Sequence, residues 1–181
     1  GDGLLSESLF LSVTRDAAAP EPSSPTCSGT IEPTCAAVET CDNEVDDDCN
    51  GYVDLCDLGC VNCVDDALEP NDFPFNVPIV GPGEYDLQLC PCRDDWFAFD
   101  KRAGQKIRVT ADFSHAEMNL NMRIYETTPD GELGDFAAGA FTATDQEVFD
   151  YTVENDGLHY MRVYIFGGED DSQGSYRLTI Q

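Results

Sequence analysis

All nine cysteines of this 181-residue chain lie between Cys27 and Cys92, and no lysine or arginine separates them. Thiols at this density rarely persist in a reducing cytosol, so the pattern favours disulfides and an extracellular or cell-surface location. A zinc protein is the alternative, but only Cys60 and Cys63 stand at zinc-ligand spacing. Because nine is odd, one cysteine must be free, intermolecular or otherwise engaged, and we expect it within 56–92.

The spacing of the cysteines leaves their connectivity open. Cys27 and Cys35 are eight residues apart, as are Cys41 and Cys49, which is compatible with two small closed loops. Each closure would stabilise the fold by roughly 2–4 kcal/mol, which a segment poor in apolar residues needs. The other cysteines allow too many pairings to choose among them: Cys56, Cys60, Cys63, Cys90 and Cys92.

The charge balance excludes several classes of partner. The chain has 36 acidic and 9 basic residues, a formal net charge of −27. Such a surface repels phosphate backbones and anionic lipid, so we expect no nucleic-acid partner. No apolar run approaches the roughly 20 residues that span a bilayer. The chain begins at Gly1 without a signal-peptide pattern, which is expected of a processed, secreted product.

Composition divides the chain into four segments: 1–16 with an apolar stretch, a Pro-rich linker over 17–34, a Cys/Asp-rich segment over 35–66, and 67–181. The last segment has short runs of alternating apolar and polar residues between turn signals, which is typical of an all-β sandwich. The expected strands are 84–89, 96–100, 105–113, 119–126, 146–153, 158–166 and 175–180. No stretch keeps a helical period over three turns, so an α/β fold is not expected.

Several short motifs follow one another in 67–181: EPND at 69–72, DWFAF at 95–99, AGQ at 103–105, NLNMRIY at 119–125, GLHYMRV at 157–163 and GSYRLTI at 174–180. Their order resembles the bacterial pre-peptidase C-terminal domain. The resemblance implies a jelly-roll-like β-sandwich without catalytic activity that serves secretion, substrate binding or surface display. Cys90 and Cys92 depart from the family pattern and look like a local addition.

The acidic stretch 46–57 has the spacing of a calcium-binding loop. Counted from Asp46, oxygen-bearing side chains fall at positions 1, 3, 5, 9 and 12, Gly51 permits a bend at position 6, and position 7 offers a backbone carbonyl. The predicted Ca²⁺ ligands are Asp46, Asp48, Asn50, Tyr52, Asp54 and Asp57. Hard oxygen donors without a nearby histidine favour Ca²⁺ over transition metals. No helix pattern flanks the loop, unlike in an EF-hand.

The wider string 39–54 resembles the Cys/Asp repeats of secreted bacterial surface proteins, which are similar to thrombospondin type 3 calcium repeats. The resemblance implies that Cys41 and Cys49 are bonded and clamp the calcium loop. The alternative is a solvated, disordered acidic linker, which blocks of like charge commonly form.

A second calcium site is predicted where the sandwich begins, since related sandwich domains bind calcium with such a segment. Its candidate ligands are Glu69, Asn71 and Asp72 together with Asp94 or Asp95. The alternative is a capped turn without a metal. No motif of a hydrolase, metalloprotease or phosphate-binding loop is present, and we interpret His115 and His159 as structural residues. We therefore expect a protein without enzymatic activity.

The N-terminal stretch predicts a half-buried strand over 4–14, with an apolar side formed by Leu5, Leu9, Leu11 and Val13. No hairpin turn follows it, so its partner must be a distant sheet edge. If that edge belongs to a neighbouring copy, the protein is a pilus-like structural subunit of a bacterial extracellular filament, a homopolymer built by strand addition. If the edge is its own, the chain is a monomeric, adhesin-like or accessory module for an extracellular ligand.

Overall fold

The computed structural model describes residues 35–75, 77–128, 130–167 and 172–181. The chain divides into two units, Gly1–Thr34 and Cys35–Gln181, and every described residue belongs to the second. The predicted strand over 4–14, the linker over 17–34 and Cys27 lie outside the described residues.

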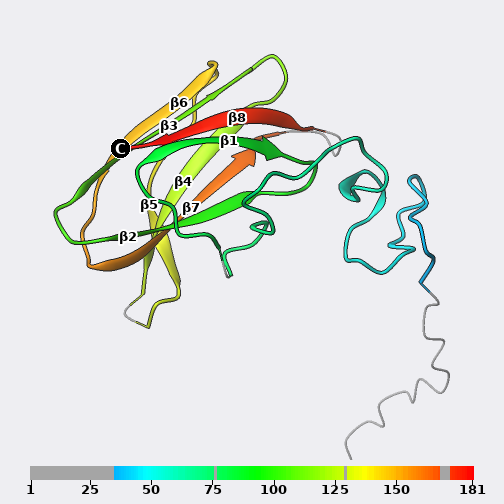
Figure 1. The fold of residues 1–181 in the computed structure, drawn as a ribbon, viewed down its shortest axis with the longest axis horizontal. Coiled ribbons are helices and arrows are strands. Elements are labelled where there is room, and N and C mark those ends of the chain that lie inside the picture. The colour runs from blue at the N-terminus through cyan, green and yellow to red at the C-terminus, as the bar shows by residue number, and fades with distance from the viewer. Residues whose placement is uncertain (1–34, 76, 129, 168–171) are drawn as a thin grey trace, which may run out of the picture. The chain divides into compact units, whose positions relative to one another are not determined.

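The described residues form eight strands in two four-stranded antiparallel sheets, seen as two layers in Figure 1. They are β1 (Gly83–Leu89), β2 (Asp95–Lys101), β3 (Lys106–Phe113), β4 (Leu120–Thr127), β5 (Leu133–Ala140), β6 (Gln146–Thr152), β7 (Gly157–Ile165) and β8 (Gly174–Ile180). One sheet has the order β1-β8-β3-β6 and the other β2-β7-β4-β5. Among the described residues the only helix is the three-residue η1 (Asp54–Cys56), and no helix there is long and apolar enough to cross a membrane.

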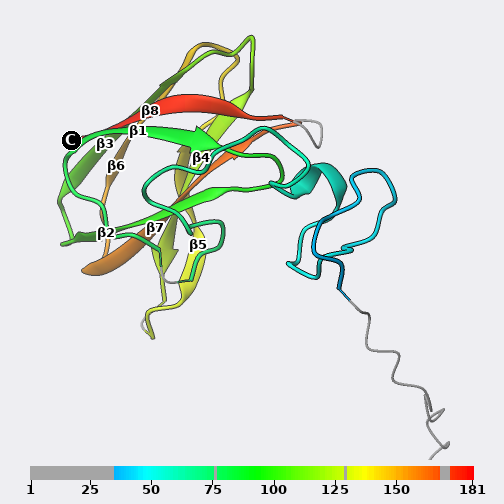
Figure 2. The ribbon, with the colours of Figure 1, turned by 45° about the vertical axis from the view of Figure 1, so that its right-hand side comes forward.

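Consecutive strands mostly alternate between the layers, as Figure 2 shows for β1 and β8 in one sheet and β2 and β7 in the other. This strand order is that of a jelly roll, so the predicted jelly-roll-like β-sandwich is confirmed. The core lies between the sheets and follows the alternation seen in the sequence. On β3, Ile107, Val109 and Ala111 are fully buried, whereas the residues between them face outward.

The strand β5 was not expected from the sequence. Its residues, LGDFAAGA, include two glycines and three alanines, which have low strand propensity. It pairs with the outer edge of β4, and two register shifts interrupt that pairing. Gly139 faces Arg123 in this pairing, and a Cβ there would meet the backbone oxygen of Met122 at 2.5 Å. Tertiary pairing, and not local preference, therefore makes this strand.

The segment before β1 lies against the outer edge of β2. The backbone N–H of Trp96 donates to the carbonyl of Asn71 at 2.8 Å, and that of Ala98 donates to Pro78 at 2.9 Å. Val80 in turn donates to the carbonyl of Ala98 at 2.9 Å. These bonds satisfy the edge of β2 and fix the position of the EPND motif beside it.

Four disulfides join eight of the cysteines: Cys35–Cys49, Cys41–Cys60, Cys56–Cys92 and Cys63–Cys90. The Cys41–Cys49 pair implied by the repeat resemblance is wrong, and so is a Cys27–Cys35 loop. The expectation that the odd cysteine falls within 56–92 is also wrong, because all five cysteines there are paired. The ninth cysteine is Cys27.

The path of the acidic loop explains why these cysteines pair as they do. The backbone N–H of Ala36 donates to the carbonyl of Asp47 at 2.6 Å, which brings the start of the Cys/Asp-rich segment beside the middle of the loop. Cys35 therefore meets Cys49, and Cys41 pairs across the loop with Cys60. The resulting closed loops interleave, whereas sequence spacing alone favours separate ones.

The disulfides Cys56–Cys92 and Cys63–Cys90 tie the Cys/Asp-rich segment to the start of β2. We expect their joint replacement by serine to lower the free energy of unfolding by roughly 2–4 kcal/mol per bridge and to make residues 35–66 sensitive to protease. Limited proteolysis with mass spectrometry and thermal unfolding measure both effects. The control is replacement of Cys35 and Cys49, whose bond lies within the segment, and it should leave 50–66 attached. Equal protease resistance in both variants would contradict the prediction.

Candidate metal centre

Three carboxylates converge in the Cys/Asp-rich segment. One oxygen from each of Glu39, Asp46 and Asp48 lies within 4.8 Å of the other two. Glu39 is buried, and it accepts backbone N–H groups from Asp47 at 2.8 Å, Asp48 at 3.3 Å and Asp54 at 3.1 Å. These three donors offset the lost hydration of the carboxylate. Glu39 therefore organises the loop around a concentration of negative charge.

Asp46 closes the bend of the acidic loop. Its two carboxylate oxygens accept the backbone N–H groups of Asn50 at 3.1 Å and Gly51 at 3.0 Å. Gly51 has φ of +98°, a conformation that residues with a Cβ rarely adopt. The bend predicted at this glycine is confirmed.

The carboxylates of Asp54 and Asp57 do not converge with those of Glu39, Asp46 and Asp48, whereas the Asn50 side chain contacts Asp48. Asp54 accepts the backbone N–H groups of Asn43 and Glu44, both at 2.9 Å. The amide of Asn50 donates to Asp48 at 3.2 Å and also to Asp57. The structure thus groups Asp46 and Asp48 with a third carboxylate, and the roles of Asn50, Tyr52, Asp54 and Asp57 as metal ligands stay predictions.

Glu39 was missed as a candidate ligand because the loop count started at Asp46. The available signal was its place at the head of the repeat string, seven residues before Asp46. A fixed loop template does not include a residue that folds back from outside it.

A second group of carboxylates lies where the Cys/Asp-rich segment meets the sandwich. We call it the junction cluster, and it comprises Asp65, Asp66, Glu69, Asn71, Asp72 and Asp95 with Arg93. Asn71 is 2% exposed and is fixed on both sides: its backbone N–H donates to Glu69 at 2.6 Å and its side-chain amide donates to the carbonyl of Trp96 at 3.2 Å. The structure therefore brings together Glu69, Asn71 and Asp72 as predicted and adds Asp65 and Asp66.

Asp72 connects the junction cluster to the acidic loop. One of its oxygens, Oδ2, accepts the hydroxyl of Tyr52 at 3.0 Å and an N–H of Arg93 at 3.2 Å. The Arg93 guanidinium also lies over the Tyr52 ring, 3.9 Å from its centroid, and 4.0 Å from an oxygen of Asp65. Tyr52 thus bridges the two acidic groups through its side chain, a role that the loop template does not contain.

Asp94, just before β2, and Asp95, its first residue, contact different partners. The carboxylate of Asp94 accepts a hydrogen bond from the Nε–H of Arg162 at 2.7 Å. Asp95 is 1% exposed and accepts the hydroxyl of Tyr176, a core residue of β8. Of the two alternatives named from the sequence, Asp95 interacts electrostatically with Glu69, Asp66 and Asp72, and Asp94 with Asp72.

Burial and mutual repulsion disfavour ionisation in the junction cluster. Desolvation, with a contribution from Asp72 and Asp65, raises the pKa of Glu69 to about 7. Desolvation likewise raises the pKa of Asp95 to about 8, although its bond from Tyr176 opposes the shift. The cluster therefore holds more carboxylates than its single guanidinium can neutralise.

Three buried oxygens of the junction cluster have no hydrogen-bond partner among the described residues: Oδ1 of Asp65, Oδ1 of Asn71 and Oδ1 of Asp72. Buried acceptors are ordinarily satisfied, so such atoms indicate a missing partner. Carboxylate and amide oxygens are the donors that Ca²⁺ prefers. Among the described residues, three carboxylate oxygens come within 4.8 Å of one another at Glu39, Asp46 and Asp48 and not in the junction cluster, so the unpartnered oxygens are the observation there that suits a divalent cation.

The two histidines do not form part of either acidic group. His159 is 1% exposed, its Nδ1 lies 3.2 Å from the carbonyl of Gly157, and its ring lies against Tyr151. His115 lies in the turn after β3, where its backbone N–H donates to Asp145 at 2.8 Å. Both placements agree with structural roles.

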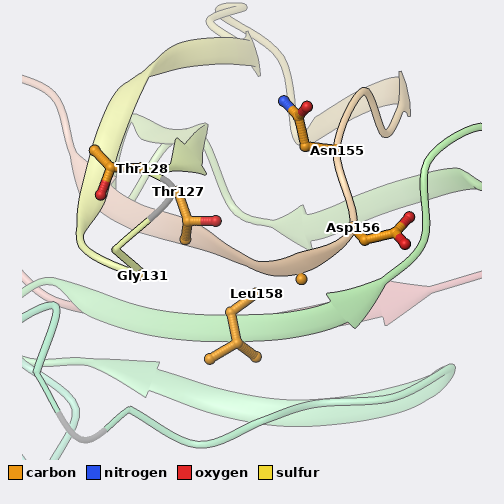
Figure 3. A pocket seen from close by; sticks show the side chains of 7 residues that line it. Thr127, Thr128, Gly131, Asn155, Asp156 and Leu158 are labelled. Carbon is orange, nitrogen blue, oxygen red and sulfur yellow. The ribbon is translucent and has the colours of Figure 1, made fainter.

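A hollow beside the turn between β6 and β7 also lacks a catalytic arrangement. Figure 3 shows that its polar side chains, Asn155, Asp156 and Thr127, point in different directions and away from Leu158. The carboxylate of Asp156 is engaged by the backbone N–H of Ala103 at 2.8 Å. These groups do not converge on a common point.

Solved structures with a similar fold include a pre-peptidase C-terminal domain of a collagenase from Bacillus anthracis, at 13% identity over 58% of this chain and 91% of that one, with a TM-score of 0.46. A periplasmic inhibitor of g-type lysozyme from Aeromonas hydrophila has 14% identity over 58% and 95%, with a TM-score of 0.42. A surface-associated copper-binding protein of Methylomicrobium album BG8 has 5% identity over 58% and 99%, with a TM-score of 0.43.

No family model matches the chain, and no curated relative matches it. The similarity to these solved structures concerns only the path of the backbone. The jelly-roll fold of this chain is established by its own strand pairing. The four disulfides are typical of proteins that fold in an oxidising compartment, such as the cell exterior or envelope.

The raised pKa values predict how the protein freed of divalent cations responds to pH. The folded state holds protons on Glu69 and Asp95 more tightly than the unfolded chain does, so their stabilising contribution is present at low pH and is lost as pH rises through about 7 and about 8. We expect the melting temperature of the chelator-treated protein to fall over this range.

Asp95→Asn should flatten this fall, because the amide does not ionise. Asp100→Asn changes an exposed carboxylate on the same strand and should keep the wild-type slope. Differential scanning calorimetry from about pH 5 to about pH 9 makes the comparison. Identical slopes for the two variants would show that Asp95 does not titrate in this range.

Proposed function

We propose that this chain is a calcium-stabilised, non-catalytic module of an extracellular or envelope protein, in which the cation holds the Cys/Asp-rich segment against the sandwich. The observation that carries the proposal is the set of three buried, unpartnered oxygens of Asp65, Asn71 and Asp72. They lie among carboxylates whose charge a single guanidinium, that of Arg93, does not balance. A divalent cation supplies the missing charge and the missing partners.

Calcium suits the donors better than a transition metal does. The groups available are carboxylate and amide oxygens, and the cysteines of this region are all in disulfides. Hard cations prefer such oxygens, whereas zinc and copper select nitrogen and sulfur. The Glu39, Asp46 and Asp48 group offers the same chemistry and is proposed as a second calcium site.

The two proposed sites are coupled through Tyr52. Its backbone belongs to the acidic loop, while its hydroxyl donates to Asp72 of the junction cluster. An ion in the loop restricts the backbone at Tyr52, and an ion at the junction fixes Asp72. We therefore propose that each ion favours binding of the other and that together they make the region rigid.

Calorimetric titration of calcium into the metal-free protein tests the assignment. Asp72→Asn should weaken the junction site by roughly tenfold to 100-fold or more, and Asp46→Asn with Asp48→Asn should do the same to the loop site. Asp100→Asn, an exposed change on β2, should bind as the wild type does. If the wild type shows no binding tighter than about 1 mM, the calcium proposal is wrong.

We further propose that the module self-associates, with the N-terminal strand of one copy added to a sheet edge of another. The described sheets have edge strands at β5 and β6 that each pair on one side only, and β5 exposes Phe136 with 53% of its surface accessible. An edge of this kind accepts an added strand through main-chain hydrogen bonds. The apolar side chains of Leu5, Leu9, Leu11 and Val13 would supply the contacts.

Deleting residues 1–16 should then leave a soluble monomer, while the full chain forms larger species. Analytical ultracentrifugation across a concentration series distinguishes the two, with a Leu9→Asp, Leu11→Asp variant of the full chain as the matched control for chain length. A monomeric full chain, or unchanged assembly after the deletion, would refute strand donation and favour a monomeric accessory module.

A further inference from the structure

A pocket of about 430 Å³ opens on the outer face of the β2-β7-β4-β5 sheet, away from every residue of the two acidic groups. Its walls include Asn119, Asn121, Arg123, Phe141, Tyr164 and Phe166. Because Leu120, Met122 and Ile124 fill the core, the alternate residues of β4 face outward into this site. The volume falls within the roughly 300–1,000 Å³ of small-ligand sites.

The pocket has aromatic walls that are open to solvent. Phe141 and Phe166 have 49% and 60% of their surface exposed, and Phe136 lies next to Phe141 with 6.1 Å between ring centroids. Exposed aromatic rings gathered at one place on a protein of net charge −27 are typical of a binding surface. Flat aromatic faces accept the C–H faces of a sugar ring or another flat apolar surface.

Two buried polar atoms in the same pocket have no hydrogen-bond partner within the described part of the chain. They are Oδ1 of Asn119, an acceptor, and Nε of Arg123, a donor. Buried groups of this kind are ordinarily satisfied, so a ligand that brings one donor and one acceptor would complete both. A sugar hydroxyl supplies either function.

The Arg123 guanidinium is held by rings and not by an acid. It lies 5.3 Å from the ring centroid of Tyr164, 5.5 Å from that of Phe141 and 5.9 Å from that of Phe136. None of the ion pairs between described residues includes it, whereas Arg162, which faces it on β7, is paired with Asp94. The rings and the hydroxyl groups of Tyr125 and Tyr164 therefore orient the guanidinium, and its Nε–H is the donor without a partner among the described residues.

We propose that this pocket binds a sugar ring of a neutral glycan, which goes beyond the proposed calcium-dependent function and does not depend on it. The ring stacks on Phe141 or Phe166, one hydroxyl donates to Asn119, and another oxygen accepts from Arg123. The net charge of −27 disfavours a polyanionic glycan, because the surrounding field repels it.

Titration of the full-length protein with neutral hexasaccharides tests the site, with the Nε–H resonance of Arg123 as the readout. The probes are maltohexaose, cellohexaose and N-acetylchitohexaose, at concentrations up to about 10 mM, ten times a dissociation constant of about 1 mM. A hexauronate is the charged comparison. We expect at least one neutral probe to shift this resonance in a saturable way.

Phe141→Ala and Arg123→Lys should each weaken that binding by about tenfold, the second because lysine keeps the charge but lacks Nε. Phe75→Ala is the control, since Phe75 is 77% exposed and lies outside the pocket. Three results would overturn the proposal: no saturable shift with any neutral probe, binding of the hexauronate alone, or an equal loss in Phe75→Ala. A shift that depends on protein concentration without glycan would assign the pocket to a second copy and would overturn it as well.

Discussion

Repulsion between carboxylates is the constraint on which the Cys/Asp-rich segment depends. The segment has almost no apolar interior, and Val38, Val45 and Val64 are 70%, 51% and 80% exposed. Hydrophobic burial therefore cannot hold the like charges together. Covalent bonds do so, because four disulfides cross within about sixty residues and two of them reach the start of β2. They limit how far the acidic groups can separate, and so they hold the two groups of carboxylates in place.

The sandwich was predictable because several strands, such as β3, β6 and β8, bury alternate residues and leave the others at the surface. Alternation in 107–113 and 120–125 translated directly into the two layers, and the turns followed from glycine and aspartate pairs. The strand β5 was not predictable, because its pairing with β4 overrides a sequence of small residues. The disulfide pairs were not predictable either, since spacing gives loop length but not the hydrogen bond from Ala36 to Asp47 that brings Cys35 to Cys49.

In the candidate sites, too, residues that are close in sequence could be predicted, whereas those brought in by the tertiary fold could not. A spacing rule found Asp46, Asp48 and Gly51, whose geometry is set by contacts within five residues. It could not find Glu39, which folds back from outside the loop. Asp65 and Asp66 stand shortly before the EPND motif and belong to neither of the two patterns used. Residues that complete a site from another segment leave no periodic signal, and only their partners in space identify them.

The few basic side chains are distributed unevenly over the sandwich, and this distribution separates its two kinds of surface. Arg93 is drawn into the junction cluster, where it contacts Asp72 and stacks on Tyr52. Arg123, on the outer sheet face, is instead surrounded by aromatic rings. None of the ion pairs between described residues includes Arg123, so in this acidic chain its guanidinium contacts aromatic rings and not a carboxylate. The acidic groups are thus where we propose a cation, and the aromatic face is where we propose an uncharged ligand that needs hydrogen bonds.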